Sequence, residues 1–305
     1  MSRRSLGDTG RAVPQNAAGQ AARFRRESRG MSAIAPRSQR AALLAAVVVC
    51  CALGALALLP ALARAQAGAP SPTVVLVHGA WDRPAGWDGV AARLRAAGYP
   101  VVVPDNPLRT LPGDAAAIAR VLHGVAGPIV LVGHSYGGMV ITNAGLNNPR
   151  VKALVYIAAF APDQGETALG LIARSPGSLL LPALLPVPFI GPDHRLGVNT
   201  TINPLLFPTV FAQDAPPRAA RVMAVTQRPA TLASGAGKSG VPAWRTIPSW
   251  YMVARNDRII PPAVERFMAQ RAHAITVEIA SSHAAPVAHP AEVANLILTA
   301  ARAAS

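Results

Sequence analysis

The stretch "PIVLVGHSYGG", residues 128–138, decides the fold. It places an apolar run directly before Gly133-His134-Ser135-Tyr136-Gly137, and a helix-forming segment follows. A G-x-S-x-G sequence between a strand and a helix predicts a sharp, strained turn that exposes the serine hydroxyl at the end of the strand. Because glycine-rich loops can contain the same pattern by chance, the elements on either side must support this interpretation.

Strand-like and helix-like segments alternate on both sides of this turn. Near-continuous apolar strands separated by helices are typical of a parallel sheet covered on both faces, so the sequence predicts an α/β fold. The expected strands are residues 73–77, 100–104, 128–132, 151–160, 249–254 and 274–280, and the expected helices are 87–98, 113–125, 136–148, 261–272 and 289–304.

The alternation breaks between about residues 163 and 246, where prolines are dense. Proline forbids long helices and central strands, so we expect an irregular lid inserted into the α/β domain rather than a second domain. The block contains "SLLLPALLPVPFI" (residues 178–190) and "PLLFPTVF" (204–211). These stretches predict an apolar lining and a substrate with an apolar acyl or alcohol group.

Residues 1–67 differ in composition from the rest of the chain. An uncharged apolar run, residues 41–59, is followed by the A-x-A sequences 63–65 and 65–67, which predicts a cleaved signal peptide. We expect translation to start at Met31 and the exported protein to be periplasmic or secreted. The alternative is an uncleaved membrane anchor formed by residues 41–59, since about 18 apolar residues can span a bilayer. The folded domain is expected over residues 71–305.

Charge and cysteine content exclude several functions. The formal net charge of the chain is +15, but basic residues in the leader supply much of it and the others are scattered without runs. We therefore expect no nucleic-acid partner, and membrane contact only through an uncleaved leader. Cys50 and Cys51 both lie in the leader, so the mature chain would have no disulfide, thiol nucleophile or cysteine metal site. The sequence carries no signal for the oligomeric state.

A serine nucleophile needs a base and an acid to orient that base. Of the seven histidines, only His283 lies in a short loop after the last predicted strand, at the sheet edge where Ser135 also emerges. Asp257 follows the preceding strand and would hold His283 in the required tautomer. Asp163, which follows the strand before that, is the alternative acid. Backbone N–H groups of Tyr136 and of Ala80, in "VHGAW", are the expected oxyanion donors.

The motifs at these positions resemble the α/β-hydrolase superfamily. They are "VLVHGAW" (75–81), "LVGHSYGGMV" (131–140), "VARNDRIIPP" (253–262) and "SSHAAPVAHPAEVANLI" (281–297). The similarity is greatest to the esterase branch with plant methyl-ester esterases, hydroxynitrile lyases and their bacterial relatives, and it covers about residues 73–303. It implies Ser135, Asp257 and His283 as a catalytic triad, Ala80 and Tyr136 as oxyanion donors, and no metal or organic cofactor.

The sequence departs from the lyases of this branch at Ala284, where they carry a lysine that stabilises the departing cyanide. We therefore expect an exported serine hydrolase that cleaves carboxylic esters of apolar small molecules through an acyl-enzyme. Two alternatives stay open at this point. One is a cofactor-free lyase or another non-hydrolytic reaction on the same triad, and the other is a non-catalytic homologue that only binds a small molecule.

Overall fold

The computed structural model describes residues 71–191 and 194–304. Residues 1–67, with the expected signal peptide, membrane-anchor alternative and Met31 start, lie outside the described residues. The main sheet has six parallel strands in the order β2-β1-β3-β4-β8-β9. Their bounds are Val101–Val102 (β2), Thr73–Val77 (β1), Ile129–His134 (β3), Val151–Ile157 (β4), Ser249–Ala254 (β8) and Ile275–Ile279 (β9).

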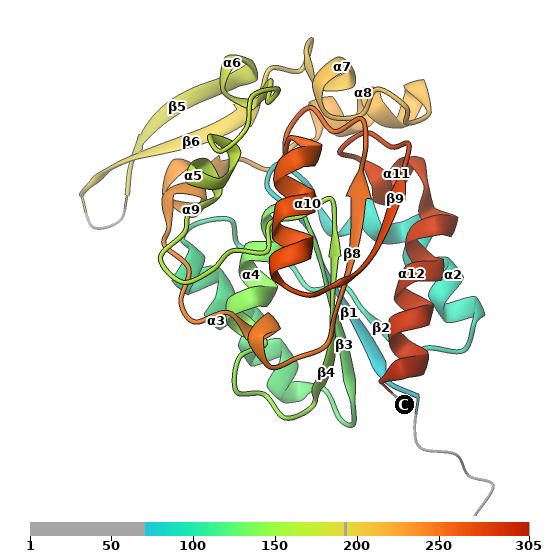
Figure 1. The fold of residues 1–305 in the computed structure, drawn as a ribbon. Coiled ribbons are helices and arrows are strands. Elements are labelled where there is room, and N and C mark those ends of the chain that lie inside the picture. The colour runs from blue at the N-terminus through green and yellow to red at the C-terminus, as the bar shows by residue number, and fades with distance from the viewer. Residues whose placement is uncertain (1–70, 192–193, 305) are drawn as a thin grey trace, which may run out of the picture. The chain divides into compact units, whose positions relative to one another are not determined.

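Helices cover both faces of this sheet (Figure 1). On one side lie α3 (Leu111–Gly124), α4 (Tyr136–Ala144) and α10 (Pro262–Arg271), and on the other α2 (Asp88–Ala96) and α12 (Pro290–Ala303). Alternate residues of β1, β3, β4 and β8 enter two separate cores: Val75 packs with the first group and Val74 with the second. This is the pattern that period-two strands buried on both faces require, and it confirms the predicted α/β fold.

Residues 158–248, here called the insert, connect β4 to β8. The insert contains the helices α5 (Ala168–Ile172), α6 (Leu180–Ala183), α7 (Phe207–Val210), α8 (Pro217–Val225) and α9 (Leu232–Ala236), with the short 3-10 helix η2 (Ala243–Arg245). Its helices α6, α7 and α8 lie beyond the carboxyl ends of the main strands (Figure 1). No described helix of the insert exceeds nine residues, as the proline density predicts. Whether the insert acts as a lid stays a prediction.

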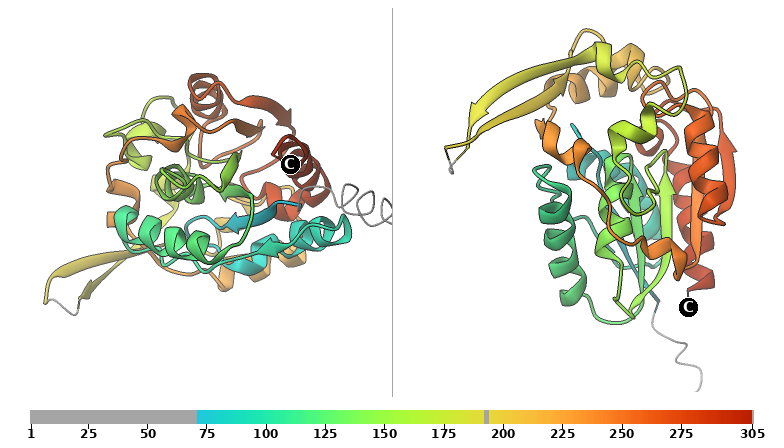
Figure 2. Two further views of the ribbon diagram at one scale, coloured as in Figure 1. Left: turned by 90° about the horizontal axis from the view of Figure 1, so that it is seen from below. Right: turned by 60° about the vertical axis from the view of Figure 1, so that its left-hand side comes forward.

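The sequence did not predict the small antiparallel sheet in the insert. Its order is β5-β6-β7, with β5 (Leu184–Ile190) at one edge, β6 (Leu196–Ile202) in the centre and β7 (Ala230–Thr231) at the other edge. Pro186 and Pro188 both lie in β5, which is compatible with a strand because an edge strand leaves half of its N–H positions unpaired. The β5–β6 hairpin extends away from the main sheet (Figure 2).

The remaining described elements are short. They are the 3-10 helix η1 (Pro84–Trp87), which follows β1, and α11 (Ala285–Ala288), which precedes α12. Within residues 71–191 and 194–304, no helix is both long enough and apolar enough to cross a membrane.

Candidate active site

Ser135 occupies the turn between β3 and α4, as predicted. Its φ of 54° and ψ of −124° lie in a region that costs a residue with a side chain about 1–3 kcal/mol. Glycines at both ends make the turn possible. A Cβ atom on Gly133 would lie 2.6 Å from the carbonyl oxygen of Gly137, and one on Gly137 would overlap the carbonyl oxygen of Val77. Only glycine therefore fits at these two positions.

The structure brings Ser135, His283 and Asp257 together in a continuous hydrogen-bonded chain. His283 Nε2 is 2.8 Å from Ser135 Oγ, and His283 Nδ1 is 2.5 Å from Asp257 Oδ2. The other carboxylate oxygen of Asp257 accepts the N–H groups of Ile259 and Ile260, at 2.6 and 2.9 Å. Asp257 follows β8 and His283 follows β9, so both reach the carboxyl edge of the sheet where Ser135 emerges.

Asp163, the alternative acid, lies elsewhere. Its carboxylate pairs with the guanidinium of Arg245 at 2.6 Å, and its N–H donates to Glu166. The acid that contacts His283 is therefore Asp257.

Two backbone amides beside Ser135 are free to donate. Ala80 and Tyr136 line the same cavity as Ser135, and neither N–H makes a hydrogen bond to any group in the described part of the chain. Tyr136 opens α4, where the first N–H groups have no partner within the helix. Two donors without a partner in the described part of the chain thus belong to residues that line the cavity with Ser135, as expected for an oxyanion site.

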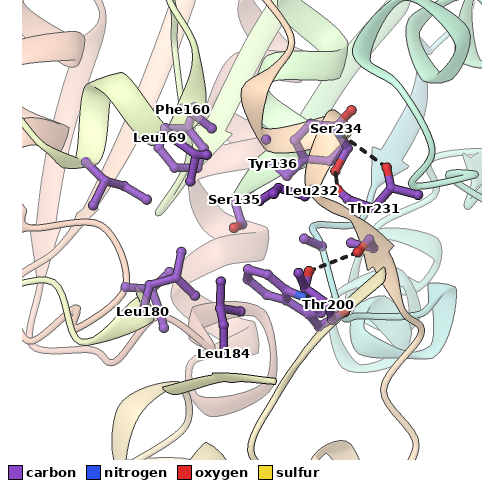
Figure 3. A pocket seen from close by; sticks show the side chains of 17 residues that line it. Ser135, Tyr136, Phe160, Leu169, Leu180, Leu184, Thr200, Thr231, Leu232 and Ser234 are labelled. Atoms are coloured by element: carbon purple, nitrogen blue, oxygen red, sulfur yellow. Dashed lines mark hydrogen bonds between the residues drawn. The ribbon is translucent and has the colours of Figure 1, made fainter. Parts of the chain in front are cut away.

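The cavity at Ser135 is small and apolar, with a volume of about 50 Å³. Most of its wall comes from the insert, including Leu180, Leu184 and Leu232, which face Ser135 in Figure 3. The apolar lining predicted for residues 178–190 is therefore confirmed at Leu180 and Leu184. The prediction is wrong for residues 204–211, which do not line the cavity. Phe211, the last residue of that stretch, instead packs its ring edge-on against His283, with 4.7 Å between the ring centroids.

Sequence reasoning missed a buried pair behind His283. His134 Nε2 lies 2.8 Å from the carbonyl oxygen of His283, and His134 Nδ1 lies 3.9 Å from Asp82. Burial, helped by the nearby His283, lowers the pKa of His134 well below its usual range, so its ring is neutral and Nε2 donates. Burial also raises the pKa of Asp82 to about 6. The sequence signal for Asp82 was its position, two residues after the expected oxyanion donor Ala80.

Glu265, on α10, is a second carboxyl group that the sequence did not single out. It is fully buried and accepts the N–H of Ala254 at 2.9 Å. Burial and the neighbouring Asp257 raise the pKa of Glu265 well above its usual range. A neutral Glu265 therefore adds no second negative charge beside Asp257.

Comparison with known proteins identifies the family of this chain. The model of the alpha/beta hydrolase family matches residues 74–296. The carbendazim hydrolyzing esterase of Nocardioides sp. is 35% identical over 140 residues, which are 41% of this chain and 55% of that protein. The chain thus spans little more than half the length of this relative. The pyrethroid hydrolase of Sphingobium wenxiniae is 29% identical over 245 residues, 73% of this chain and 85% of that protein.

A solved structure shows the same fold. Polyneuridine aldehyde esterase has a TM-score of 0.66 and 20% identity, over 75% of this chain and 98% of that one. The chain belongs to the alpha/beta hydrolase family, and its relatives include an esterase and a pyrethroid hydrolase. The resemblance stated from the motifs is confirmed.

The two candidate acids give a direct test. Asp257→Asn should leave folding intact but lower kcat by orders of magnitude, about 10⁴ in the best-studied triad, because the amide stabilises the wrong imidazole tautomer. Asp163→Asn is the matched control and should change kcat little, since Asp163 contacts Arg245 instead. Ester hydrolysis assays with both variants check this. The reverse ranking would contradict the assignment of the acid.

Asp82 predicts a pH dependence of stability. Its pKa rises from 3.8 when unfolded to about 6 when folded, so the folded state binds more protons between these values. Stability therefore falls as pH rises from about 4 to about 6, by up to about 3 kcal/mol. Asp82→Asn removes the cost of burying a charged carboxylate, so at pH 8 the variant should unfold at a higher urea concentration than the unchanged protein. This gain in stability should shrink towards pH 4. An equal difference at both pH values would contradict this origin.

Proposed function

We propose that this protein is a serine hydrolase that cleaves carboxylic esters of apolar small molecules through an acyl-enzyme on Ser135. The observation that carries the proposal is the buried chain from Ser135 through His283 to Asp257, with separations of 2.8 and 2.5 Å. A serine hydroxyl is a weak nucleophile alone and needs such a base within hydrogen-bond reach.

The first half of the reaction forms the acyl-enzyme. Ser135 Oγ attacks the ester carbonyl carbon while His283 Nε2 takes the hydroxyl proton. The carbonyl oxygen becomes an oxyanion, which accepts hydrogen bonds from the N–H groups of Ala80 and Tyr136. Asp257 keeps Nδ1 protonated and stabilises the imidazolium. His283 then donates its proton to the alcohol oxygen, the carbon–oxygen bond breaks and the alcohol leaves.

The second half returns the enzyme to its starting state. A water molecule attacks the acyl carbon and loses its proton to His283 Nε2. The bond to Ser135 Oγ breaks, Oγ regains the proton from His283, and the carboxylic acid leaves. Every proton transfer uses the same nitrogen atom, so one base serves both halves.

An apolar substrate is supported by the cavity wall and by the relatives. Phe160, Leu180, Leu184 and Leu232 surround Ser135, and such a wall favours hydrocarbon over charged groups. Two relatives are described as a carbendazim esterase and a pyrethroid hydrolase. Export is also part of the proposal, and it rests on the composition of residues 41–59 and on the A-x-A sequences after them.

A phosphonate label tests the proposal. An organophosphonate should modify the protein once, at Ser135, and p-nitrophenyl butyrate should be hydrolysed without added metal or cofactor. Ser135→Ala should abolish labelling and nearly all turnover, leaving a residual rate of about 10³-fold over water. Ser234→Ala removes another serine hydroxyl of the cavity wall and should keep full labelling.

Three results would contradict parts of this proposal. Folded protein that neither reacts with phosphonate nor hydrolyses esters would favour a small-molecule-binding homologue. Labelling at Ser135 with cyanohydrin cleavage but no ester hydrolysis would favour a lyase. Labelling at Ser234 would show that the nucleophile is Ser234 and not Ser135.

A further inference from the structure

Two cavities share one lining residue, Trp81. The cavity at Ser135 has a volume of about 50 Å³, and a second cavity, between residues 81–86 and α8, has about 490 Å³. Among the described residues, the two linings share only Trp81. The lining of the larger cavity includes the apolar residues Ala219, Val222, Met223 and Val287 and the charged residues Asp82, Arg83 and Arg218.

The two volumes indicate which ligand groups each cavity can hold. A cavity needs about 10–15 Å³ of such volume to hold one water molecule, and pockets for drug-sized ligands measure about 300–1,000 Å³. The cavity at Ser135 therefore holds only a short group on the reacting carbonyl. The second cavity has the size of a ligand pocket, but Ser135 does not line it, and Trp81 is the residue that both linings share.

Trp81 keeps this position at a conformational cost. Its φ is 60°, in the left-handed region where glycine is the low-cost residue and a bulky side chain is rare. The backbone is held there by the N–H of Arg228, which donates to the carbonyl oxygen of Trp81 at 3.3 Å. A strained residue that its surroundings hold in place is a reason to ask what its side chain does.

The indole is also fixed to the insert. Its Nε1–H donates to the carbonyl oxygen of Thr200 at 2.9 Å and lies 3.2 Å from the Thr200 hydroxyl. That hydroxyl in turn donates to the carbonyl oxygen of Ala230. These contacts anchor the ring on the central strand β6, so the side chain of Trp81 is held in place and does not rotate freely.

We propose that Trp81 determines the substrate size of this site by separating Ser135 from the second cavity. The unchanged protein then favours esters with a short apolar group, and a variant without the indole accepts long-chain esters whose chain enters the second cavity. This inference rests on the proposed ester hydrolysis at Ser135.

The test compares kcat/KM for p-nitrophenyl butyrate and p-nitrophenyl dodecanoate. Trp81→Ala should raise the dodecanoate-to-butyrate ratio by about 10-fold or more, since each methylene that enters an apolar pocket is worth about 10-fold or more in specificity. Trp81→Phe keeps a ring in the wall and should leave the ratio near that of the unchanged protein. If Trp81→Ala does not fold, Trp81→Leu also removes the indole but loses less packing.

A second substitution locates the new binding space. Ala219→Phe, on α8, fills part of the second cavity and should not alter the ratio by itself, because Trp81 already excludes the chain. Combined with Trp81→Ala, it should return the ratio towards its original value. Leu184→Ala is the matched control, because it enlarges the cavity at Ser135 on a wall that the second cavity does not share.

The outcomes separate this inference from the proposed function. If the unchanged protein is neither labelled by phosphonate nor active on butyrate, both fail. If it is labelled and active, but the ratio is the same in folded, labelled Trp81→Ala or Trp81→Leu protein, only the inference fails. A gain in Trp81→Ala that Ala219→Phe does not reverse, or an equal gain in Leu184→Ala, also overturns it.

Discussion

The site depends on the close approach of backbone around Ser135. The Ser135 carbonyl accepts the N–H groups of Gly138 and Phe160, at 2.9 and 3.2 Å, and its own N–H donates to Ile157 at 3.3 Å. These bonds tie β3, α4 and the end of β4 to one strained residue. A Cβ atom on Gly79 would come within 2.7 Å of the Ser135 side chain, so the loop after β1 must also pass without a side chain. This packing brings the loop that carries Ala80 against the Ser135 turn.

The electrostatics of the site follow from burial. Ser135, His283 and Asp257 are all less than 5% exposed, so the attraction between an imidazolium and a carboxylate is stronger than it would be in water. Two neighbouring ionisable groups could weaken this arrangement. Burial keeps His134 neutral, and burial together with Asp257 keeps Glu265 neutral. Neither therefore adds a competing charge to the hydrogen-bonded chain.

Ser135, Asp257 and His283 could be predicted from the sequence because the strands of a parallel sheet all run in the same direction. In an α/β sheet the carboxyl ends of β3, β8 and β9 lie at one edge, so residues that follow these strands converge although they are far apart in the chain. The apolar runs were sufficient to locate the strands, and the glycines were sufficient to locate the turn at Ser135. The contact of residues 178–190 with the cavity followed from composition alone.

Other features depend on packing that has no local sequence pattern. The antiparallel β5-β6-β7 sheet was missed because two of its strands are exposed or very short and the prolines of β5 argue against a strand in isolation. Asp82 and Glu265 are acids whose environment comes from distant elements. Trp81 follows a predicted oxyanion donor, but its role as a wall depends on α8 and on Thr200, more than 100 residues away.

The central claim is that Ser135 and His283 act as one unit, and a double-mutant comparison of kcat tests it most directly. Residues that act in one covalent mechanism have strongly non-additive effects. The account predicts that Ser135→Ala, His283→Ala and the double variant lose nearly the same amount of activity, because either change alone removes the acyl-enzyme route. A double variant whose loss equals the product of the two single losses would show independent roles and contradict the account.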